Sequence, residues 1–374
     1  MQIETYHIKP RWLFVRVEAS GGFVGWGEAI VEGASRTVAS LIDELSDLVL
    51  GQDPRRIEHI WQMLYRGNFY RGGPHLMSAI SGLDQALWDI KGKALGAPVY
   101  ELLGGRVRDH VRVYAHSRAN GTETAVESAT RLVAAGFDAL KLGITVPFPV
   151  QPSPAMIDAE LASLMVVREA VGREVDIAID FHGRTSGDAA ISLIRGLDEF
   201  APLFIEEPVV PEDPGEMARV RRATGAVIAT GERLFSRWDF RKTIEAGAVS
   251  IVQPDLCHAG GISEVRRIAS YAEANSLQIA PHNPLGPISL AACIQIAAAS
   301  PNFLIQEHPT LPDGSDLGHG ILQEPFVVEG SRIAIPERSG LGVEVSEESL
   351  IERVYDGGWR TPQVRHSDGA VADW

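Results

Sequence analysis

The first third of the chain changes from a strand-like to a helical pattern of apolar positions. Residues 12–18 and 23–28 are apolar and partly alternating, and Ser20-Gly21-Gly22 between them supplies turn residues. This arrangement predicts an antiparallel hairpin. From residue 35 to about residue 90 the apolar spacing is that of helices, and Gly104-Gly105 then marks a boundary.

Beyond about residue 110, short apolar runs that end in a polar residue alternate with helix-like stretches. The last six runs end 23 to 27 residues apart, which leaves room for a strand, a loop and a crossover helix. Strands alternating with helices indicate a parallel sheet, and eight runs favour a (β/α) barrel. A doubly wound sheet is the alternative, but no Gly-x-Gly-x-x-Gly follows the first strand. The runs are residues 111–115, 139–142, 175–180, 202–206, 227–232, 250–255, 277–282 and 303–307.

The barrel rhythm is lost after about residue 325. The stretches 326–328 and 341–345 are β-like, and we expect this last segment to return and pack on the N-terminal part. The length of 374 residues suits one large domain and a smaller one. We therefore predict an N-terminal α+β domain over 1–110, a barrel over 111–324 and a returning segment over 325–374.

Composition and charge narrow the function classes. The formal net charge is −15 and no basic cluster offsets it, so we expect neither nucleic acid nor an anionic membrane as a partner. An anionic small molecule stays possible, because a metal ion and one lysine can reverse the sign inside a pocket. No apolar stretch is long enough to cross a bilayer, and the N-terminus lacks the pattern of an export signal. With only Cys257 and Cys293, a reducing cytoplasm is expected.

Polar side chains follow the barrel strands at the end where all strands of a barrel face one mouth. A single carboxylate after a strand often caps the next helix. Recurrence in six successive units is poorly explained by capping and predicts a site instead. The residues are Lys141, Asp180, His182, Glu206, Glu232, Asp255, His282 and Glu307.

Asp180, Glu206 and Glu232 close three consecutive strands and could converge on one cation. Ligands that are all oxygens favour Mg²⁺ over Mn²⁺ or Ca²⁺, and zinc is disfavoured because no Cys pair or close His pair accompanies them. Glu206 and Glu207 are adjacent and point to opposite sides of a strand. Their spacing leaves open which of them faces the mouth.

The histidines are candidates for proton transfer. Asp180 and His182 are two residues apart, so both side chains could face the site if the strand continues that far. Asp255 and His282 close neighbouring strands, and a carboxylate beside an imidazole fixes its tautomer and raises its pKa. His258 and His308 lie near the same rim, but nothing in the pattern gives them a role.

These motifs resemble the enolase superfamily, in its mandelate racemase subgroup. The motifs are Val-Asp-Ile-Ala-Ile-Asp180-Phe-His182, Phe-Ile-Glu206-Glu-Pro, Gly-Glu232-Arg, Gln-Pro-Asp255-Leu, Ala-Pro-His282 and Gln-Glu307. Over nearly the whole chain the sequence is most similar to the bacterial D-galactonate dehydratases within that subgroup. This likeness includes Pro10-Arg-Trp12, Val24-Gly-Trp-Gly-Glu28, Gly51-Gln-Asp-Pro54, Phe69-Tyr-Arg-Gly-Gly-Pro74 and the motif from Asp84 to Lys93.

The resemblance implies a capping N-terminal domain, a modified (β/α)₇β barrel and one Mg²⁺ held by Asp180, Glu206 and Glu232. It implies a sugar-acid substrate, D-galactonate first, and a homo-oligomer, often an octamer. His282, oriented by Asp255, would take the proton from C2, and Lys141 and Glu307 would bind the substrate carboxylate. His182 would protonate the leaving 3-hydroxyl, so that the product is a 2-keto-3-deoxy acid. Enolase-superfamily use of Mg²⁺ with a Lys or His base is a known pattern.

The sequence departs from this pattern at residues 117–122, 143–155 and 308–323. These stretches lie at or near the mouth, so they leave open which aldonate or aldarate is the substrate. Racemases of the subgroup carry a second base at the position of Gly143, so glycine there favours elimination. A racemase, epimerase or cycloisomerase on the same scaffold remains an alternative. A metal-binding protein without activity is a second, which the presence of every expected catalytic side chain disfavours. In mannonate dehydratases the base comes from elsewhere, which would leave Asp255 and His282 unexplained.

Overall fold

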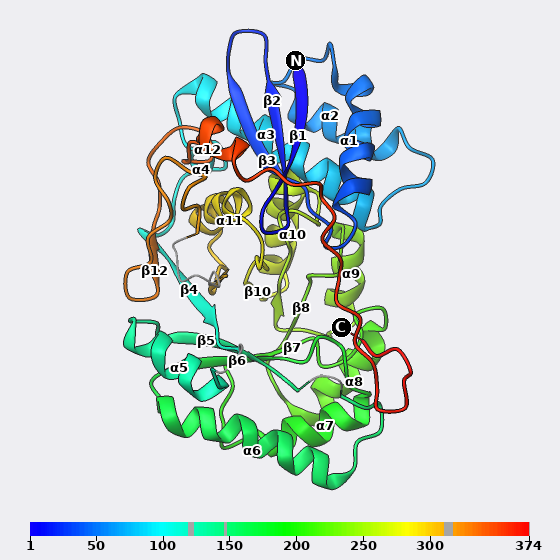
Figure 1. The fold of residues 1–374 in the computed structure, drawn as a ribbon. Helices are drawn as coiled ribbons and strands as arrows, with labels where there is room; N and C mark the ends of the chain where they lie inside the picture. Colours follow the sequence, from blue (N-terminus) through cyan, green and yellow to red (C-terminus); the bar gives the residue numbers. More distant parts are fainter. Residues whose placement is uncertain (119–122, 146–147, 310–316, 374) are drawn as a thin grey trace.

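The N-terminal part of the computed structural model contains a three-stranded antiparallel sheet (Figure 1). The structure describes residues 1–118, 123–145, 148–309 and 317–373. β2 (Trp12–Glu18) and β3 (Val24–Glu28) form the predicted hairpin, with Phe14 opposite Glu28. β1 (Gln2–Ile8) pairs with the other side of β2. This strand was not predicted, because its alternation is partly obscured by polar residues on both faces.

Three helices cover one face of this sheet: α1 (Ser35–Val49), α2 (Ile57–Arg66) and α3 (Pro74–Leu95). We call β1–β3 with α1–α3 the N-terminal unit. The backbone of α3 approaches β3 closely, because glycines stand where the two elements meet. A Cβ atom on Gly27 would lie 2.0 Å from the carbonyl oxygen of Gly82. The repeated glycines of β3 are therefore a packing requirement.

The predicted barrel is present, with seven crossover helices between eight parallel strands in the described residues. The strand order is β10-β9-β8-β7-β6-β5-β4-β11, and a parallel bridge between Ile279 and Phe303 joins the two ends. The α/β prediction and the (β/α)₇β pattern are thus confirmed. The strands are β4 (His110–His116), β5 (Ala139–Gly143), β6 (Asp176–Asp180), β7 (Ile205–Glu206), β8 (Ile228–Thr230), β9 (Ile251–Val252), β10 (Gln278–Ile279) and β11 (Gln306–His308).

The crossover helices form the outer layer of the barrel. A short helix, α4 (Val99–Leu102), links the N-terminal unit to β4. The crossover helices are α5 (Ala125–Ala134), α6 (Pro154–Val171), α7 (Gly187–Gly196), α8 (Pro214–Thr224), α9 (Arg237–Glu245), α10 (Gly261–Ala274) and α11 (Pro287–Ala299).

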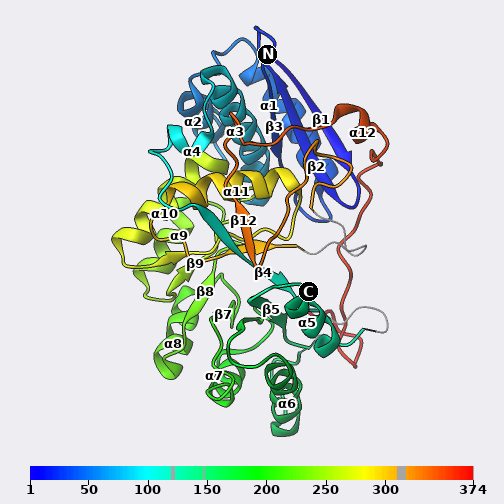
Figure 2. The ribbon, with the colours of Figure 1, turned by 90° about the vertical axis from the view of Figure 1, so that its left-hand side faces the viewer.

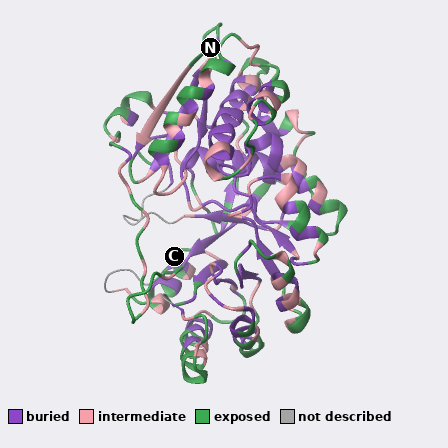
Figure 3. Cartoon of the chain, turned by 90° about the vertical axis from the view of Figure 1, so that its right-hand side faces the viewer, coloured by how far each residue is buried: buried purple, intermediate pink, exposed green. Residues whose placement is uncertain are grey.

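Helices α10 and α11 lie between the barrel sheet and the N-terminal unit (Figure 2). Every residue of α11 is buried, as expected for a helix that is apolar on all sides. Figure 3 shows buried residues running from the barrel into the N-terminal unit without an exposed layer between them. No helix in the described ranges is both long and apolar enough to cross a membrane.

The C-terminal segment differs from the prediction in detail. The β-like stretches 326–328 and 341–345 form no strand; instead β12 (Arg332–Ala334) pairs antiparallel with barrel strand β4. The chain then passes α12 (Glu347–Ile351) and reaches the N-terminal unit, where Val354 forms a bridge with Ile8. Whether a segment pairs as a strand depends on whether the edge of another strand is free beside it, and the spacing of apolar residues carries no information on this. The domain boundaries at residues 110 and 324 stay predictions.

Gly27→Ala should destabilise the protein by about 1–3 kcal/mol, the usual cost of overpacking a close contact. The added methyl would meet backbone atoms of Gly82, which cannot rotate away. Urea unfolding followed by circular dichroism measures the effect. Gly143→Ala is the control, because the nearest atom to its added Cβ is 4.0 Å away. Equal stability of the two variants would contradict this account of how α3 packs.

Candidate active site

Eight apolar side chains fill the inside of the barrel below the site. They are buried and touch one another: Tyr114, Ala139, Ala178, Phe204, Ala229, Ile251, Ala280 and Ile305. Side chains alternate along a strand, so the residue two positions farther on faces the same interior, one level nearer the mouth. That level is polar and consists of His116, Lys141, Asp180, Glu206, Gly231, Gln253, His282 and Glu307. Five residues predicted for the site therefore share one buried layer.

Lys141 lies at the centre of the carboxylates in this layer. Its Nζ is 2.8 Å from Glu307 Oε1, 3.0 Å from Glu206 Oε2 and 3.2 Å from Asp180 Oδ2. Burial lowers the pKa of Lys141, but the surrounding negative charges, those of Glu206 and Glu307 first, raise it well above its usual value. The lysine is therefore a fixed buried cation.

Asp255 and His282 form the hydrogen bond that their strand positions suggested. His282 Nδ1 is 2.7 Å from Asp255 Oδ2, and Asp255 Oδ1 accepts the backbone N–H of Cys257 at 2.6 Å. Since the carboxylate only accepts, Nδ1 carries the proton and Nε2 faces the mouth. Nε2 is 2.9 Å from Glu232 Oε2. Burial lowers the pKa of His282, but the charges of Glu307 and Glu232 and the hydrogen bonds to Asp255 and Glu232 raise it well above its usual value.

Glu307 accepts several hydrogen bonds in this structure. The backbone N–H of Asn283 donates to its Oε2 at 2.6 Å, and Lys141 and His116 Nε2 contact its Oε1. Burial raises the pKa of Glu307, but Lys141, His282 and His116 outweigh burial and hold it well below its usual value. The predicted role as a donor to a substrate oxygen therefore requires a proton that the present arrangement does not favour.

His116, at the end of β4, is a site residue that the sequence analysis missed. Arg118 Nη2 is 2.7 Å from His116 Nδ1, and His116 Nε2 is 2.6 Å from Glu307 Oε1. Arginine can only donate, so Nδ1 accepts and Nε2–H donates to Glu307. Burial and the charge of Arg118 lower the pKa of His116 to about 4. The first apolar run, extended by one residue, would have found His116 in the same position as the other strand-end residues.

Asp180 and Glu206 are the last residues of β6 and β7, and Glu232 lies two residues after β8, at the strand ends where a metal site was predicted. Glu206 Oε1 is buried and has no hydrogen-bond partner among the described residues, and Asp180 Oδ2 has only ion-pair contacts, with Lys141 Nζ and His182 Nε2. Burial and the charge of Asp180 raise the pKa of Glu206 well above its usual value. Buried carboxylate oxygens that lack donors suit a hard divalent cation.

The three carboxylates do not surround a single point as they stand. In the described part of the chain, no three His, Cys, Asp or Glu side chains are spaced to hold one ion. Lys141 Nζ lies between Asp180 and Glu206, and His282 contacts Glu232. The donor set fits Mg²⁺ in its chemistry, and the carboxylates would have to draw together around it.

Glu207 points away from this layer. Arg233 Nε donates to its Oε2 at 3.0 Å and Thr230 Oγ1 to its Oε1 at 3.0 Å. Burial and the charge of Glu232 raise the pKa of Glu207 to about 8. The structure thus resolves what spacing left open, because Glu206 faces the mouth and Glu207 supports the turn behind it.

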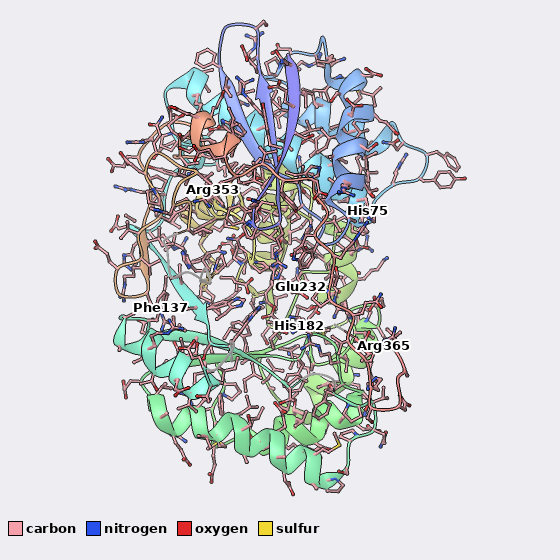
Figure 4. The ribbon with its side chains drawn as sticks, in the orientation of Figure 1. His75, Phe137, His182, Glu232, Arg353 and Arg365 are labelled. Atoms are coloured by element: carbon pink, nitrogen blue, oxygen red, sulfur yellow. The ribbon has the colours of Figure 1, made fainter. Side chains whose placement is uncertain are left out.

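His182 reaches the site by a route different from the predicted one. β6 ends at Asp180, and His182 has a left-handed backbone with φ 50°, so strand periodicity does not position it. Its backbone N–H donates to Asp180 Oδ1 at 2.9 Å, and Arg233 holds its carbonyl oxygen. The ring Nε2 is 3.3 Å from Asp180 Oδ2. Figure 4 shows His182 and Glu232 next to each other in the middle of the molecule.

His258 and His308, for which no role was predicted, have different surroundings. Ser78 Oγ is 3.0 Å from His258 Nδ1, and His258 Nε2 is 3.8 Å from Asp255 Oδ2. His308 alternates to the other side of β11 from Glu307, and burial lowers its pKa to about 4. Of the divergent stretches, residues 119–122, 146–147 and 310–316 lie outside the described residues.

Comparison with known proteins identifies the family. Residues 1–104 match the mandelate racemase / muconate lactonizing enzyme N-terminal domain, and residues 124–349 match the enolase C-terminal domain-like family. The chain is 47% identical to a D-galactonate dehydratase of Ralstonia nicotianae, over 100% of this chain and 99% of that protein. A D-galactonate dehydratase of Pectobacterium atrosepticum is 45% identical, with the same coverage.

Solved structures agree with this assignment. An enolase from Agrobacterium radiobacter with sodium and L-malate bound superposes with a TM-score of 0.90 at 32% identity, over 99% of this chain and 98% of that one. A mandelate racemase/muconate lactonizing enzyme from Sulfitobacter has a TM-score of 0.90 at 32% identity, over 100% and 99%. The chain therefore belongs to the enolase superfamily, in the family of mandelate racemase and muconate lactonizing enzyme.

Proposed function

We propose that this chain is a Mg²⁺-dependent sugar-acid dehydratase that converts D-galactonate into 2-dehydro-3-deoxy-D-galactonate. The observation that carries the proposal is one buried layer in which a carboxylate-oriented histidine faces a lysine and several carboxylates. Such a layer can hold an anionic substrate and remove a proton from the carbon next to its carboxylate. The D-galactonate dehydratases that are 44–47% identical over the full chain support the reaction and the substrate.

Asp180, Glu206 and Glu232 are the proposed Mg²⁺ ligands. Bound there, Mg²⁺ would act as a Lewis acid and stabilise the negative charge that develops on the substrate carboxylate when the C2 proton leaves. Glu206 presents a buried oxygen without a hydrogen-bond partner among the described residues, and the buried Oδ2 of Asp180 has only ion-pair contacts, which supports their assignment. Glu207 is excluded from the set because Arg233 and Thr230 occupy its oxygens.

Lys141 binds the carboxylate of the substrate in this proposal. Its ammonium is buried, and its charge is fixed by its neighbours. A substrate carboxylate next to Glu307 adds negative charge, which raises the pKa of Glu307. Glu307 can then take up a proton and donate a hydrogen bond to the second carboxylate oxygen. His116 continues to hold the other side of Glu307 in place.

His282 is the proposed base. Asp255 holds the proton on Nδ1, so the lone pair available for C2 is on Nε2. In the structure Nε2 contacts Glu232. A cation held by Glu232 would offset the charge that keeps a proton on His282, so the pKa of the imidazole would fall and Nε2 would be free to accept the C2 proton.

His182 is the proposed acid. It gives a proton to the 3-hydroxyl, the C3–O bond breaks, and water leaves while the C2–C3 double bond forms. The enol that results tautomerises to the 2-keto-3-deoxy acid. Burial lowers the pKa of His182, against the opposing charges of Asp180 and Glu232, which makes its imidazolium a stronger acid than an exposed one.

Racemisation on the same scaffold is less consistent with the site. It needs a second base on the face of C2 opposite to His282. Gly143, beside Asp180 on the neighbouring strand, offers no side chain at the position where related racemases carry one. Elimination needs only one base and one acid, and both are present.

The purified protein with Mg²⁺ should form keto acids from aldonates, with the highest kcat/KM for D-galactonate. A panel of aldonates and aldarates assayed with semicarbazide measures this. EDTA should abolish turnover and added Mg²⁺ should restore it. A kcat/KM at least tenfold higher for another sugar acid would change the substrate and leave the reaction standing, whereas no keto acid from any substrate would overturn the proposal.

Measurements of Mg²⁺ affinity test the assignment of Glu206 as a metal ligand, with the adjacent Glu207 as the control. Glu206→Gln should weaken Mg²⁺ affinity in calorimetry by at least about tenfold, because a charged oxygen ligand is lost. Glu207→Gln removes an equally buried carboxylate that faces Arg233, and it should leave Mg²⁺ affinity nearly unchanged. Equal losses in both variants would refute the assignment of Glu206.

The two histidines should be separable by hydrogen exchange at C2. General acid-base groups contribute about 10²–10⁴ in rate. His282→Asn should abolish both dehydration and uptake of solvent deuterium at C2, while His182→Asn should lose dehydration and still exchange the C2 proton. Proton NMR of the substrate in D₂O, after Mg²⁺ binding has been verified, reads out both. Exchange by His282→Asn but not by His182→Asn would reverse the two roles.

We also infer a homo-oligomer in which Phe69 and Tyr70 contact a second copy of the chain. These two side chains are 90% and 87% exposed, and the loop that follows α2 extends away from the body of the molecule (Figure 1). Adjacent exposed aromatic rings mark an association surface. Light scattering after gel filtration should give a smaller species for Phe69→Ser with Tyr70→Ser, and no change for Leu95→Ser, which is 61% exposed elsewhere. A monomeric wild-type protein would contradict the inference.

A further inference from the structure

Glu28 of the N-terminal unit caps a helix of the barrel. The residue ends β3 and is fully buried. Its Oε1 accepts the backbone N–H of Gly286 at 2.8 Å, and its Oε2 accepts that of Ser289 at 3.0 Å. These are the free N–H groups at the start of α11, where a carboxylate is favoured by hydrogen bonding and by the helix dipole. The capped helix begins five residues after His282.

Gln85 of α3 connects the backbone of Glu28 to the turn that follows Asp255. Its Oε1 accepts the backbone N–H of Glu28 at 3.1 Å. Its Nε2 donates to the carbonyl oxygens of Glu28 at 3.2 Å and Leu256 at 2.8 Å. Leu256 directly follows Asp255, so one buried side chain connects Glu28 to the turn that carries the partner of His282.

The backbone of the segment before α11 packs closely against the Glu28 carboxylate. A Cβ atom on Gly286 would lie 2.6 Å from Glu28 Oε2, so only glycine allows the carboxylate to approach this closely. The backbone N–H of Asn283, between His282 and the helix, is itself fixed by Glu307 at 2.6 Å. Segment 282–289 is thus held at both ends, by Glu307 inside the barrel and by Glu28 outside it.

We propose that Glu28, assisted by Gln85, is a positioning residue that sets the alignment of His282 with Asp255 and with the substrate carbon. The expected effect on rate rests on the proposed dehydratase function, whereas the expected effect on the alignment of His282 rests on the contacts alone. Proton abstraction is sensitive to the placement of the base, and a misplacement of about 1 Å can cost about 100-fold in rate. Lys141, Asp180 and Glu206 belong to β5, β6 and β7, to which Glu28 and Gln85 make no hydrogen bond among the described residues. Substrate and metal binding should therefore depend much less on Glu28.

The test compares Glu28→Gln with Asp89→Asn in the full-length protein with Mg²⁺. An amide has the same shape as the carboxylate of Glu28, both oxygens of which accept backbone N–H groups. It retains one acceptor and loses the second. We expect kcat to fall about 10- to 100-fold with KM changed less than about threefold, and C2 deuterium exchange should fall in parallel.

Asp89→Asn is the matched control. Asp89, on α3, is a buried carboxylate like Glu28, but it accepts hydrogen bonds from Trp26, Leu341 and Lys93 and makes none to segments 255–258 or 282–289 among the described residues. Its substitution should lower stability in urea unfolding and leave kcat within about twofold. Equal losses of kcat in the two variants would reduce Glu28 to a structural residue and overturn the proposal.

A second readout does not depend on turnover. The proton between His282 Nδ1 and Asp255 should give a low-field NMR signal, assigned by its loss in His282→Asn. The signal should shift or broaden in Glu28→Gln and stay unchanged in Asp89→Asn. If Glu28→Gln fails to fold, Gln85→Met replaces it. This variant removes the hydrogen bond to Leu256 and keeps the length of the side chain, and the same changes in kcat and in the NMR signal are expected. An unchanged signal and unchanged kcat overturn the proposal, whereas a wild-type protein without dehydratase activity overturns the proposed function and leaves the NMR test valid.

Discussion

Negative charge buried at the mouth of the barrel is the constraint on which the rest of the site depends. Asp180, Glu206, Glu232, Asp255 and Glu307 lie within one small region, and each is almost completely or mostly removed from water. Carboxylates buried together repel each other and lose hydration, so cations must stand among them. Lys141 and His282 supply two positive charges. Removing one partner of such a cluster typically costs about 3–5 kcal/mol, which explains why these residues contact one another so closely.

The sequence predicted the parts of the molecule that follow from periodicity. The last six barrel strands were found because their apolar runs end in a polar residue at a nearly constant spacing, and this rule found Asp180, Glu206, His282 and Glu307. The two runs before them, 111–115 and 139–142, were found by their apolar character, and Lys141 lies within the second. Residues placed by other means escaped it. His182 depends on a left-handed backbone held by Arg233 and Asp180, and β1 and β12 depend on which strand edges were open. His116 follows the rule and was missed only because its run was ended one residue early.

The N-terminal unit is part of the catalytic structure as much as a cover for it. α3 turns an unusual row of buried polar side chains toward the turn after β9. Ser81 Oγ accepts from Gly260 at 2.8 Å, Asp84 Oδ2 accepts from Ser263 at 3.0 Å, and Gln85 bonds to Leu256. Buried polar groups that are fully satisfied specify one relative arrangement, whereas apolar packing alone would tolerate sliding. The proposed base and the carboxylates proposed to hold the metal are in this way supported by different parts of the molecule.

The pairing of charges in the structure also accounts for how the proposed base becomes neutral. His282 is held as a cation by Glu232 and Glu307, and in that form it cannot accept a proton. The same carboxylates are the ones assigned to the metal and to the substrate carboxylate. In the proposed complex, with Glu232 as a metal ligand and Glu307 protonated beside the substrate, both charges that raise the pKa of His282 would be cancelled, while the hydrogen bond to Asp255 would remain. Lys141 then has fewer carboxylates to balance, and its ammonium is available to the substrate. The proposal therefore makes assembly of the complex and activation of the base one electrostatic event, because the same charges would control both.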